Sequence, residues 1–157
     1  MKQRDQVAMT AAEAMELLVA NRKVQLATNG PDGFPHLVTM YYVMIDGQLT
    51  FWTYRRSQKA LNLERDPRIS CLVETGEEYF DLRGVLIQGT ARRIEDPAQV
   101  AEIGRRITAV VGGDLAGAGH DALTANVEHA ARKRFGYCVE PERIISWDHA
   151  KLLPAAG

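Results

Sequence analysis

The sequence predicts a mainly β fold with short helices, in which at least six antiparallel strands close into a six-stranded type of barrel. Two observations carry this prediction: apolar, β-branched segments of strand length recur along the chain, and turn signals such as Asp46-Gly47 join most of them as hairpins. Hairpins exclude a parallel, doubly wound sheet, and closure removes exposed strand edges. The length is that of one domain, residues 1–157.

The first half of the chain should contain two helices and three strands. Thr10 and Glu13 form a capping-box pattern that opens an N-terminal helix, within residues 1–21. Alternating apolar residues and turn signals predict strands at residues 24–28, 34–45 and 48–53. The second helix should stop at Asp66-Pro67, because the residue before a proline disfavours the helical conformation.

The second half should add four strands around a helical insertion at residues 95–132. Asp96-Pro97 is a helix-start signal, and the amphipathic helix that follows should end at Gly112-Gly113. Residues 112–119 are interpreted as a flexible connector, and weaker helical spacing follows at residues 122–132. Strands are expected at residues 68–74, 79–94, 134–139 and 143–147, with bends or bulges at Gly84 and Gly89.

Composition narrows the possible functions. A formal net charge of -1 argues against general nucleic-acid binding, which needs a basic surplus. Cys71 and Cys138 lack metal-ligand spacing and are predicted to be buried free thiols, so no metal site is expected. The N-terminus has no signal-peptide core, and no apolar run reaches the roughly 20 residues of a membrane span. We therefore expect a cytoplasmic protein without membrane partners.

The clearest functional signal lies at residues 49–63, where a strand-like run breaks and then resumes with helical spacing. Ser57 can cap the helix, so that its first-turn amides and its dipole point at an anion. Arg55, Arg56 and Lys59 add positive charge. The pattern predicts a phosphate-binding site. A capped surface helix with a solvated basic flank is the alternative that these residues leave open.

Four motifs resemble the cofactor-binding half of the pyridoxamine-phosphate-oxidase-like flavin and deazaflavin oxidoreductases. They are Gly33-Phe34-Pro35-His36, Phe51-Trp52-Thr53, Ser57-x-Lys59-x-x-Asn62-Leu63 and Asp66-Pro67-Arg68. The resemblance covers residues 22–153. It implies a split β-barrel of Greek-key type, and a homodimer whose cofactor sites straddle the subunit interface.

The resemblance also implies which residues contact the cofactor. The second strand lies along the isoalloxazine ring in this family, which implicates His36, Leu37, Val38, Thr39 and Met40. The positions that hold the ribityl phosphate are matched by Trp52, Thr53, Ser57 and Lys59. Gly84 lies on the fifth strand, beside the ring edge. Trp147 matches a tryptophan that a C-terminal strand brings near the ring, often from the partner subunit.

Three departures from the family pattern bear on the reaction. Leu37 and Tyr42 stand near places where the flavin-specific pattern has Arg and Lys, and Arg83-Gly84 replaces an Arg-Gln pair. The family oxidase handles its substrate phosphate with a C-terminal Arg-x-His-x-Arg, where this chain has residues 148–151, Asp-His-Ala-Lys. Oxidation of pyridoxamine phosphate is therefore not expected.

The cofactor implied by the resemblance is coenzyme F-420, with FMN as the alternative. Arg55 and Arg56 offer more charge than one terminal phosphate requires, which suits the longer anionic tail of F-420. The expected activity is hydride transfer to a small unsaturated or carbonyl-bearing molecule. His36 and His149 are candidate proton donors, but no catalytic side chain is assigned. A non-catalytic module that binds flavin, deazaflavin or haem is the alternative, with His36, His120, His129 and His149 as possible haem ligands.

Overall fold

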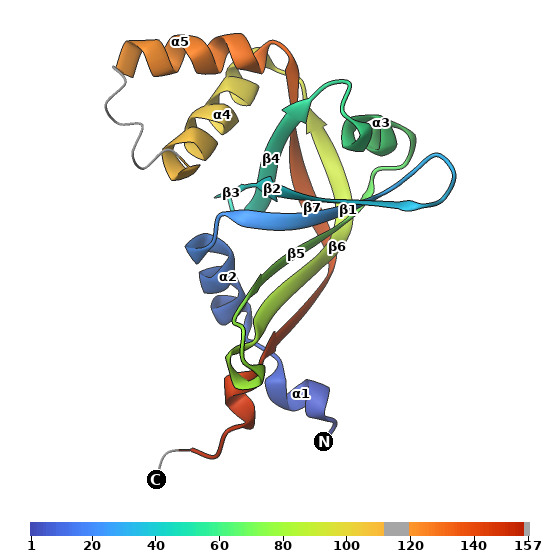
Figure 1. Cartoon of the computed structure of the whole chain (residues 1–157), viewed down its shortest axis with the longest axis vertical. Coiled ribbons are helices and arrows are strands. Elements are labelled where there is room, and N and C mark those ends of the chain that lie inside the picture. Colours follow the sequence, from blue (N-terminus) through green and yellow to red (C-terminus); the bar gives the residue numbers. More distant parts are fainter. Residues whose placement is uncertain (112–119, 156–157) are drawn as a thin grey trace.

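The computed structural model describes residues 1–111 and 120–155 (Figure 1). Over these residues, seven antiparallel strands form one strongly curved sheet in the order β2-β1-β5-β6-β7-β4-β3. The strands are β1 (Lys23–Asn29), β2 (Pro35–Tyr41), β3 (Val43–Ile45), β4 (Gln48–Tyr54), β5 (Arg68–Thr75), β6 (Arg83–Ile94) and β7 (Arg134–Asp148). The helices are α1 (Gln3–Val7), α2 (Ala11–Ala20), α3 (Gln58–Arg65), α4 (Pro97–Val111) and α5 (His120–Ala131), with short 3-10 turns η1 (Tyr79–Asp81) and η3 (His149–Leu152).

The two edge strands of the sheet, β2 and β3, are nearly continuous in sequence. Only Tyr42 separates them, so one bent segment runs from one edge of the sheet to the other and brings the edges together. The side chain of Tyr42 is buried, and its hydroxyl donates a hydrogen bond to the carbonyl of Leu18 on α2. The single strand expected at residues 34–45 is therefore divided. With β2 and β3 counted as one segment, the barrel has the six strands predicted.

The two strands expected at the C-terminal end are one long strand, β7. The ladder between β6 and β7 continues through Pro141, with a register shift between Gln88 and Gly89. A Cβ atom on Gly89 would lie 2.0 Å from the carbonyl oxygen of Glu140, so the backbones approach closely here. This local irregularity lets a proline remain within the strand, because the regular ladder is interrupted at that point.

Several other local signals are confirmed, although residues 79–81 of the strand expected at 79–94 form the 3-10 turn η1. Thr10 and Glu13 make the predicted capping box of α2, and Asp46 and Gly47 both have positive φ in the turn between β3 and β4. Both thiols are free and buried, and burial raises the pKa of the Cys71 thiol to about 12. The predicted helical insertion contains α4 and α5, while the connector expected at residues 112–119 lies outside the described residues.

Candidate cofactor site

The end of β4 and the start of α3 form a compact turn. Side chains alternate along β4, so Thr53 points into the barrel and is buried. The amide of Ser57 donates to the carbonyl of Tyr54 at 3.1 Å and closes the turn. Ser57 is then the N-cap of α3, because its hydroxyl accepts from the amide of Ala60 at 3.3 Å. The predicted helix start is therefore confirmed.

Three side chains converge at this helix start, and we call them the cradle: Thr53, Ser57 and Lys59. The ammonium of Lys59 donates to the hydroxyl of Thr53 at 3.2 Å, and that hydroxyl lies 3.1 Å from the hydroxyl of Ser57. Among the side chains that the structure describes, in residues 1–111 and 125–155, no carboxylate lies within 4 Å of the Lys59 ammonium. Burial lowers the pKa of Lys59, because the half-buried charge loses solvent without gaining a counter-charge. An anion bound here would supply that counter-charge.

A second group of cations lies beside the cradle. Tyr54 on β4 is paired with Arg134 on β7, and the guanidinium of Arg134 stacks 4.0 Å from the centre of the Tyr54 ring. The guanidinium of Arg55 lies 4.9 Å from the ring centre of Phe135. Sequence analysis missed Arg134, because only the pairing of β4 with β7 places it here. A basic residue at the start of a predicted strand was the only available signal.

The strand β2 presents two different faces. His36, Val38 and Met40 are half-buried, whereas Leu37, Thr39 and Tyr41 are exposed. In the described part of the chain, β2 pairs with β1 alone, which leaves the outer edge of its backbone open. The structure thus places the five residues predicted along the cofactor ring on an accessible edge strand.

Asn62 connects the cradle helix to the β1–β2 ladder. It is fully buried, and its side-chain amide donates to the hydroxyl of Thr28 on β1 at 3.0 Å. Its side-chain oxygen accepts from the side-chain amide of Gln58 at 2.8 Å. Thr28 lies directly opposite His36 in the β1–β2 register. The position of the cradle relative to β2 is therefore fixed by a buried hydrogen bond, a role that the motif containing Asn62 did not reveal.

The side chain of Trp52 lies on the other face of β4 from Thr53. Its ring packs against α4, where a Cβ atom on Gly104 would lie 2.4 Å from the nearest ring atom. The guanidinium of Arg134 covers the ring at 4.7 Å from its centre. Of the four residues matched to the phosphate positions, the structure brings together the side chains of Thr53, Ser57 and Lys59, and directs that of Trp52 toward the helical insertion.

Gly84 and Trp147 are direct neighbours in the β6–β7 register. The ring of Trp147 covers Gly84 so closely that a Cβ atom there would lie 2.2 Å from a ring atom. Trp147 is twelve residues along β7 from Phe135, which is paired with Thr53, and this corresponds to roughly 40 Å of strand. One chain therefore does not bring this pair and the cradle together.

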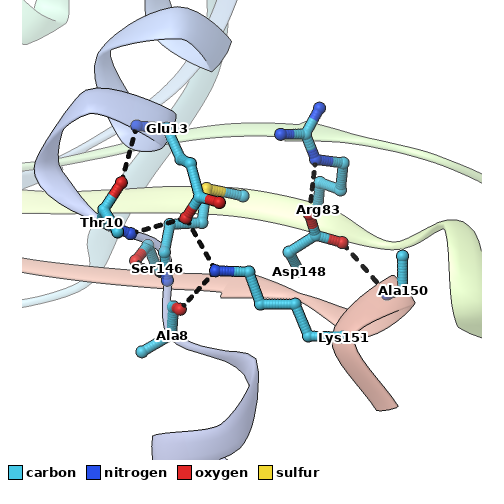
Figure 2. Close-up of polar contacts among 9 residues, drawn as sticks. Ala8, Thr10, Glu13, Arg83, Ser146, Asp148, Ala150 and Lys151 are labelled. Carbon is cyan, nitrogen blue, oxygen red and sulfur yellow. Dashed lines mark hydrogen bonds and ion pairs between the residues drawn. The ribbon is translucent and has the colours of Figure 1, made fainter. Parts of the chain in front are cut away.

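Ion pairs hold the chain around Trp147 in place (Figure 2). Asp148 accepts from Arg83 at 3.2 Å, and Lys151 donates to Glu13 of the capping box at 2.7 Å. Ser146 accepts from the amide of Met9 at 3.0 Å. The segment that ends β7 is thus tied to β6 and to the start of α2.

Among the described side chains, those of residues 1–111 and 125–155, no group of three or more His, Cys, Asp or Glu could hold a metal ion. The helices described in the structure include none that is long and apolar enough to cross a membrane.

Comparisons with known proteins identify the family. A family model described as pyridoxamine 5'-phosphate oxidase matches residues 10–148. A conserved hypothetical protein from Mycobacterium tuberculosis is 39% identical, with a TM-score of 0.85 over 100% of this chain and 96% of that chain. A search of curated proteins found no significant match.

More distant solved structures share the fold. An F-420 reductase is 21% identical, with a TM-score of 0.63 over 82% of this chain and 93% of that chain. A FAD-binding protein from Mesorhizobium loti is 20% identical, with a TM-score of 0.64 over 88% of this chain and 94% of that chain. The family match over most of the chain and the 39% identity agree with the split-barrel architecture described above. The chain belongs to the pyridoxamine 5'-phosphate oxidase family.

Proposed function

We propose that this protein is an oxidoreductase that binds coenzyme F-420 and supports hydride transfer to a small unsaturated or carbonyl-bearing molecule. The observation that carries the proposal is the half-buried Lys59 ammonium, which has a hydroxyl partner and no carboxylate within 4 Å in the described residues. The donor set of the cradle fits a phosphate: an ammonium, two hydroxyls and the first-turn amides of α3.

Each part of the site has a role in this proposal. The cradle holds the phosphate, and the backbone of β2 from His36 to Met40 lies along the ring. The bound coenzyme supplies the hydride, while the protein orients it and limits access of water. Asn62 keeps cradle and β2 at a fixed separation through Thr28. No side chain is assigned to catalysis.

The proposed site needs two chains. The resemblance matches both the cradle and Trp147 to cofactor contacts, yet roughly 40 Å of β7 separates them in one chain. A homodimer resolves this conflict if one copy supplies the cradle and a second copy supplies its Trp147. The exposed side of β2, where Leu37 is 68% exposed, offers apolar surface for such contact.

The family name does not imply oxidation of pyridoxamine phosphate by this chain. The oxidase uses its C-terminal basic motif for the substrate phosphate, and residues 148–151 occupy that place here. Asp148 is paired with Arg83, and Lys151 is paired with Glu13. These side chains hold the chain together instead of presenting free charge to a substrate.

FMN is the second candidate cofactor, because the cradle matches a single terminal phosphate. Arg55 and Arg56 favour F-420, since both are exposed cations beyond the cradle.

A module that binds the cofactor without turnover is the other candidate function. Oxidation of reduced coenzyme should be followed with quinones, enones and tetrapyrroles. Sustained turnover supports the reductase, and coenzyme binding without turnover favours the module.

Substitution of Lys59 tests the cradle. We expect Lys59→Ala to weaken binding of F-420 or FMN by more than tenfold, about the 1.4 kcal/mol of one charged hydrogen bond. Fluorescence titration measures the dissociation constant, and circular dichroism checks the fold. Lys23→Ala, at an exposed position on β1, is the matched control and should bind normally. An unchanged dissociation constant in Lys59→Ala would reject Lys59 as a phosphate ligand.

The pH dependence of binding gives a second readout. Because burial lowers the pKa of Lys59 from its usual 10.5, the ammonium is lost at a lower pH than in an exposed lysine. Affinity for the phosphate should therefore be full well below that lowered pKa and should fall as the pH rises through it. Lys59→Arg should retain affinity at alkaline pH, because arginine stays protonated. The same alkaline fall in Lys59→Arg would assign the titration to another group.

A further inference from the structure

Tyr42 fastens the Met40 end of β2 to two other parts of the chain. Its amide donates to the carbonyl of Arg22 at 2.9 Å, which extends the β1–β2 ladder by one hydrogen bond. Its side chain is 1% exposed, and its hydroxyl donates to the carbonyl of Leu18 near the end of α2. One residue therefore ties the end of β2 both to the start of β1 and to α2.

The carbonyl that Tyr42 uses belongs to the C-terminal end of a helix. The last four carbonyls of an α-helix have no partner within the helix, so other groups must satisfy them. In α2, the side chain of Asn21 donates to the carbonyl of Leu17 at 2.8 Å, and Tyr42 serves the carbonyl of Leu18. Both leucines are buried in the barrel core, which holds α2 in place. The Leu18 carbonyl is therefore a fixed point against which Tyr42 can set the position of β2.

The side chain of Tyr42 is directed away from any surface that a cofactor could reach. Its ring lies in the barrel core, against which Val38 and Met40 of β2 also pack. Burial raises the pKa of its hydroxyl above the usual 10.0, because the phenolate would lose its solvent, so the hydroxyl remains a hydrogen-bond donor at neutral pH. Any influence of Tyr42 on a ligand must therefore pass through the backbone of β2.

The strand β2 depends on such ties because it lies at the edge of the sheet. In the part of the chain that the structure describes, β1 is its only strand partner. At the His36 end, Thr28 lies opposite His36 and accepts a buried hydrogen bond from Asn62 of α3. Tyr42 supplies the corresponding buried hydrogen bond at the Met40 end. Buried hydrogen bonds thus hold β2 at both ends.

We propose that Tyr42 is a positioning residue of the cofactor site, whose hydroxyl fixes the Met40 end of β2 where the strand's backbone can meet the coenzyme ring. This role rests on the proposed function, because it requires a ring that lies along β2. Hydrogen bonds weaken steeply when their length or angle departs from the preferred range, so a small shift of β2 should weaken the ring contacts. The cradle lies on β4 and α3 and should not respond.

Tyr42→Phe tests this role, since it removes the hydroxyl and keeps the buried ring. We expect the dissociation constant of F-420, measured by fluorescence titration, to rise by about five- to tenfold, the effect of roughly one hydrogen bond. The absorbance spectrum of the bound coenzyme should shift toward that of the free coenzyme. Glycerol phosphate carries a phosphate without a ring, and its affinity in NMR titrations should stay within about twofold.

Tyr137→Phe is the matched control. Tyr137 is 2% exposed, and its hydroxyl is buried without a hydrogen-bond partner among the described groups. Its substitution therefore removes a buried hydroxyl but no hydrogen bond, and should change neither the affinity for F-420 nor the spectrum of the bound coenzyme. Circular dichroism should show the same fold in both variants.

Hydrogen exchange gives a second readout, which begins with the unsubstituted protein. There, F-420 should slow the exchange of β2 amides, because contacts with the ring restrain the strand. In Tyr42→Phe, this protection should be weaker toward Met40 than toward His36, since Asn62 still holds the His36 end.

Three results would overturn this role while the cradle stands. Tyr42→Phe that is destabilised but keeps its affinity and its bound spectrum would make the hydroxyl purely structural. An equal loss of affinity for glycerol phosphate would mean that the whole site is disturbed. Unprotected β2 amides in the unsubstituted protein with F-420 bound would separate the strand from the ring. Failure of both F-420 and FMN to bind the unsubstituted protein would instead overturn the proposed function, and this role with it.

Discussion

Lys59 and Arg134 at the α3 end of the barrel differ in their partners from Arg83 and Lys151 at the Trp147 end, although Arg68 beside α3 is paired with Asp66. At the α3 end, Lys59 and Arg134 are held by a hydroxyl, aromatic rings and a carbonyl. At the Trp147 end, Arg83 is paired with Asp148, and Lys151 with Glu13 (Figure 2). Charge that is compensated within the chain serves its assembly, whereas charge that is ordered and left uncompensated is available to a ligand. This difference favours the α3 end as the place of the proposed anion site.

The two ends of the barrel also differ in the interactions that stabilise them. The α3 end depends on a buried polar contact between Asn62 and Thr28. The Trp147 end depends on close packing of Trp147 on Gly84 and on ion pairs near the surface. Buried polar groups are costly to leave without a partner, while exposed ion pairs contribute little. Substitutions at the two ends should therefore differ in size and in their dependence on salt.

The largest loss of stability is expected from Asn62→Ala. The substitution leaves the side chains of Thr28 and Gln58 without their buried partner, which should lower the free energy of unfolding by about 2–3 kcal/mol. Urea denaturation measures this change. Asn126→Ala, at an exposed position on α5, is the control and should be nearly neutral. A loss below about 0.5 kcal/mol would show that Asn62 does not anchor α3.

A smaller loss is expected from Gly84→Ala at the other end. The added methyl group would overlap the Trp147 ring, which should cost about 1–2 kcal/mol of unfolding free energy and displace the ring. A double-mutant cycle with Trp147→Leu isolates the clash, because Gly84→Ala should cost less once the ring is gone. If Gly84→Ala lowers the free energy of unfolding equally with Trp147 and with Trp147→Leu, the strain lies in the backbone. If a second copy's Trp147 contributes to the site, Gly84→Ala should also weaken cofactor binding.

Much of the fold was predictable because its signals are local. The capping box at Thr10 and the Asp46-Gly47 turn are short patterns with one preferred geometry, and both are confirmed. The helix start at Ser57 is equally local. Strand alternation predicts that Thr53 and Trp52 face opposite sides, but it does not say which element covers each face. The packing of Trp52 on α4 therefore required the structure.

Features that depend on distant partners were not predictable. The break at Tyr42 reflects a contact of its hydroxyl with α2, and the continuity of β7 through Pro141 depends on a register shift in β6. Arg134 joins Arg55 only because β4 pairs with β7. The separation of Trp147 from the cradle follows from the length of β7. Each of these results from tertiary pairing, which a single sequence does not encode in any short pattern.

The smallest effect is expected from Glu13→Gln, which removes a charge but can keep the capping-box hydrogen bond from Thr10. The hydrogen bond from Lys151 holds the pKa of Glu13 below its usual 4.5. The contribution of the Glu13–Lys151 ion pair to stability should thus be present above pH 4.5 and be lost as the pH falls through the lowered pKa of Glu13. At neutral pH and low salt, calorimetry should show a melting temperature about 1–2 °C lower, with no difference at high salt.

Cofactor binding in Glu13→Gln then decides whether the two ends are independent. If this ion pair only fastens the end of β7, the dissociation constant should match that of the unsubstituted protein, in contrast to the loss expected for Lys59→Ala. A tenfold weakening would instead mean that the position of Lys151 and Trp147 governs binding. In that case the compensated charge at this end would also serve the ligand, and the contrast between the two ends would fail as a guide to the site.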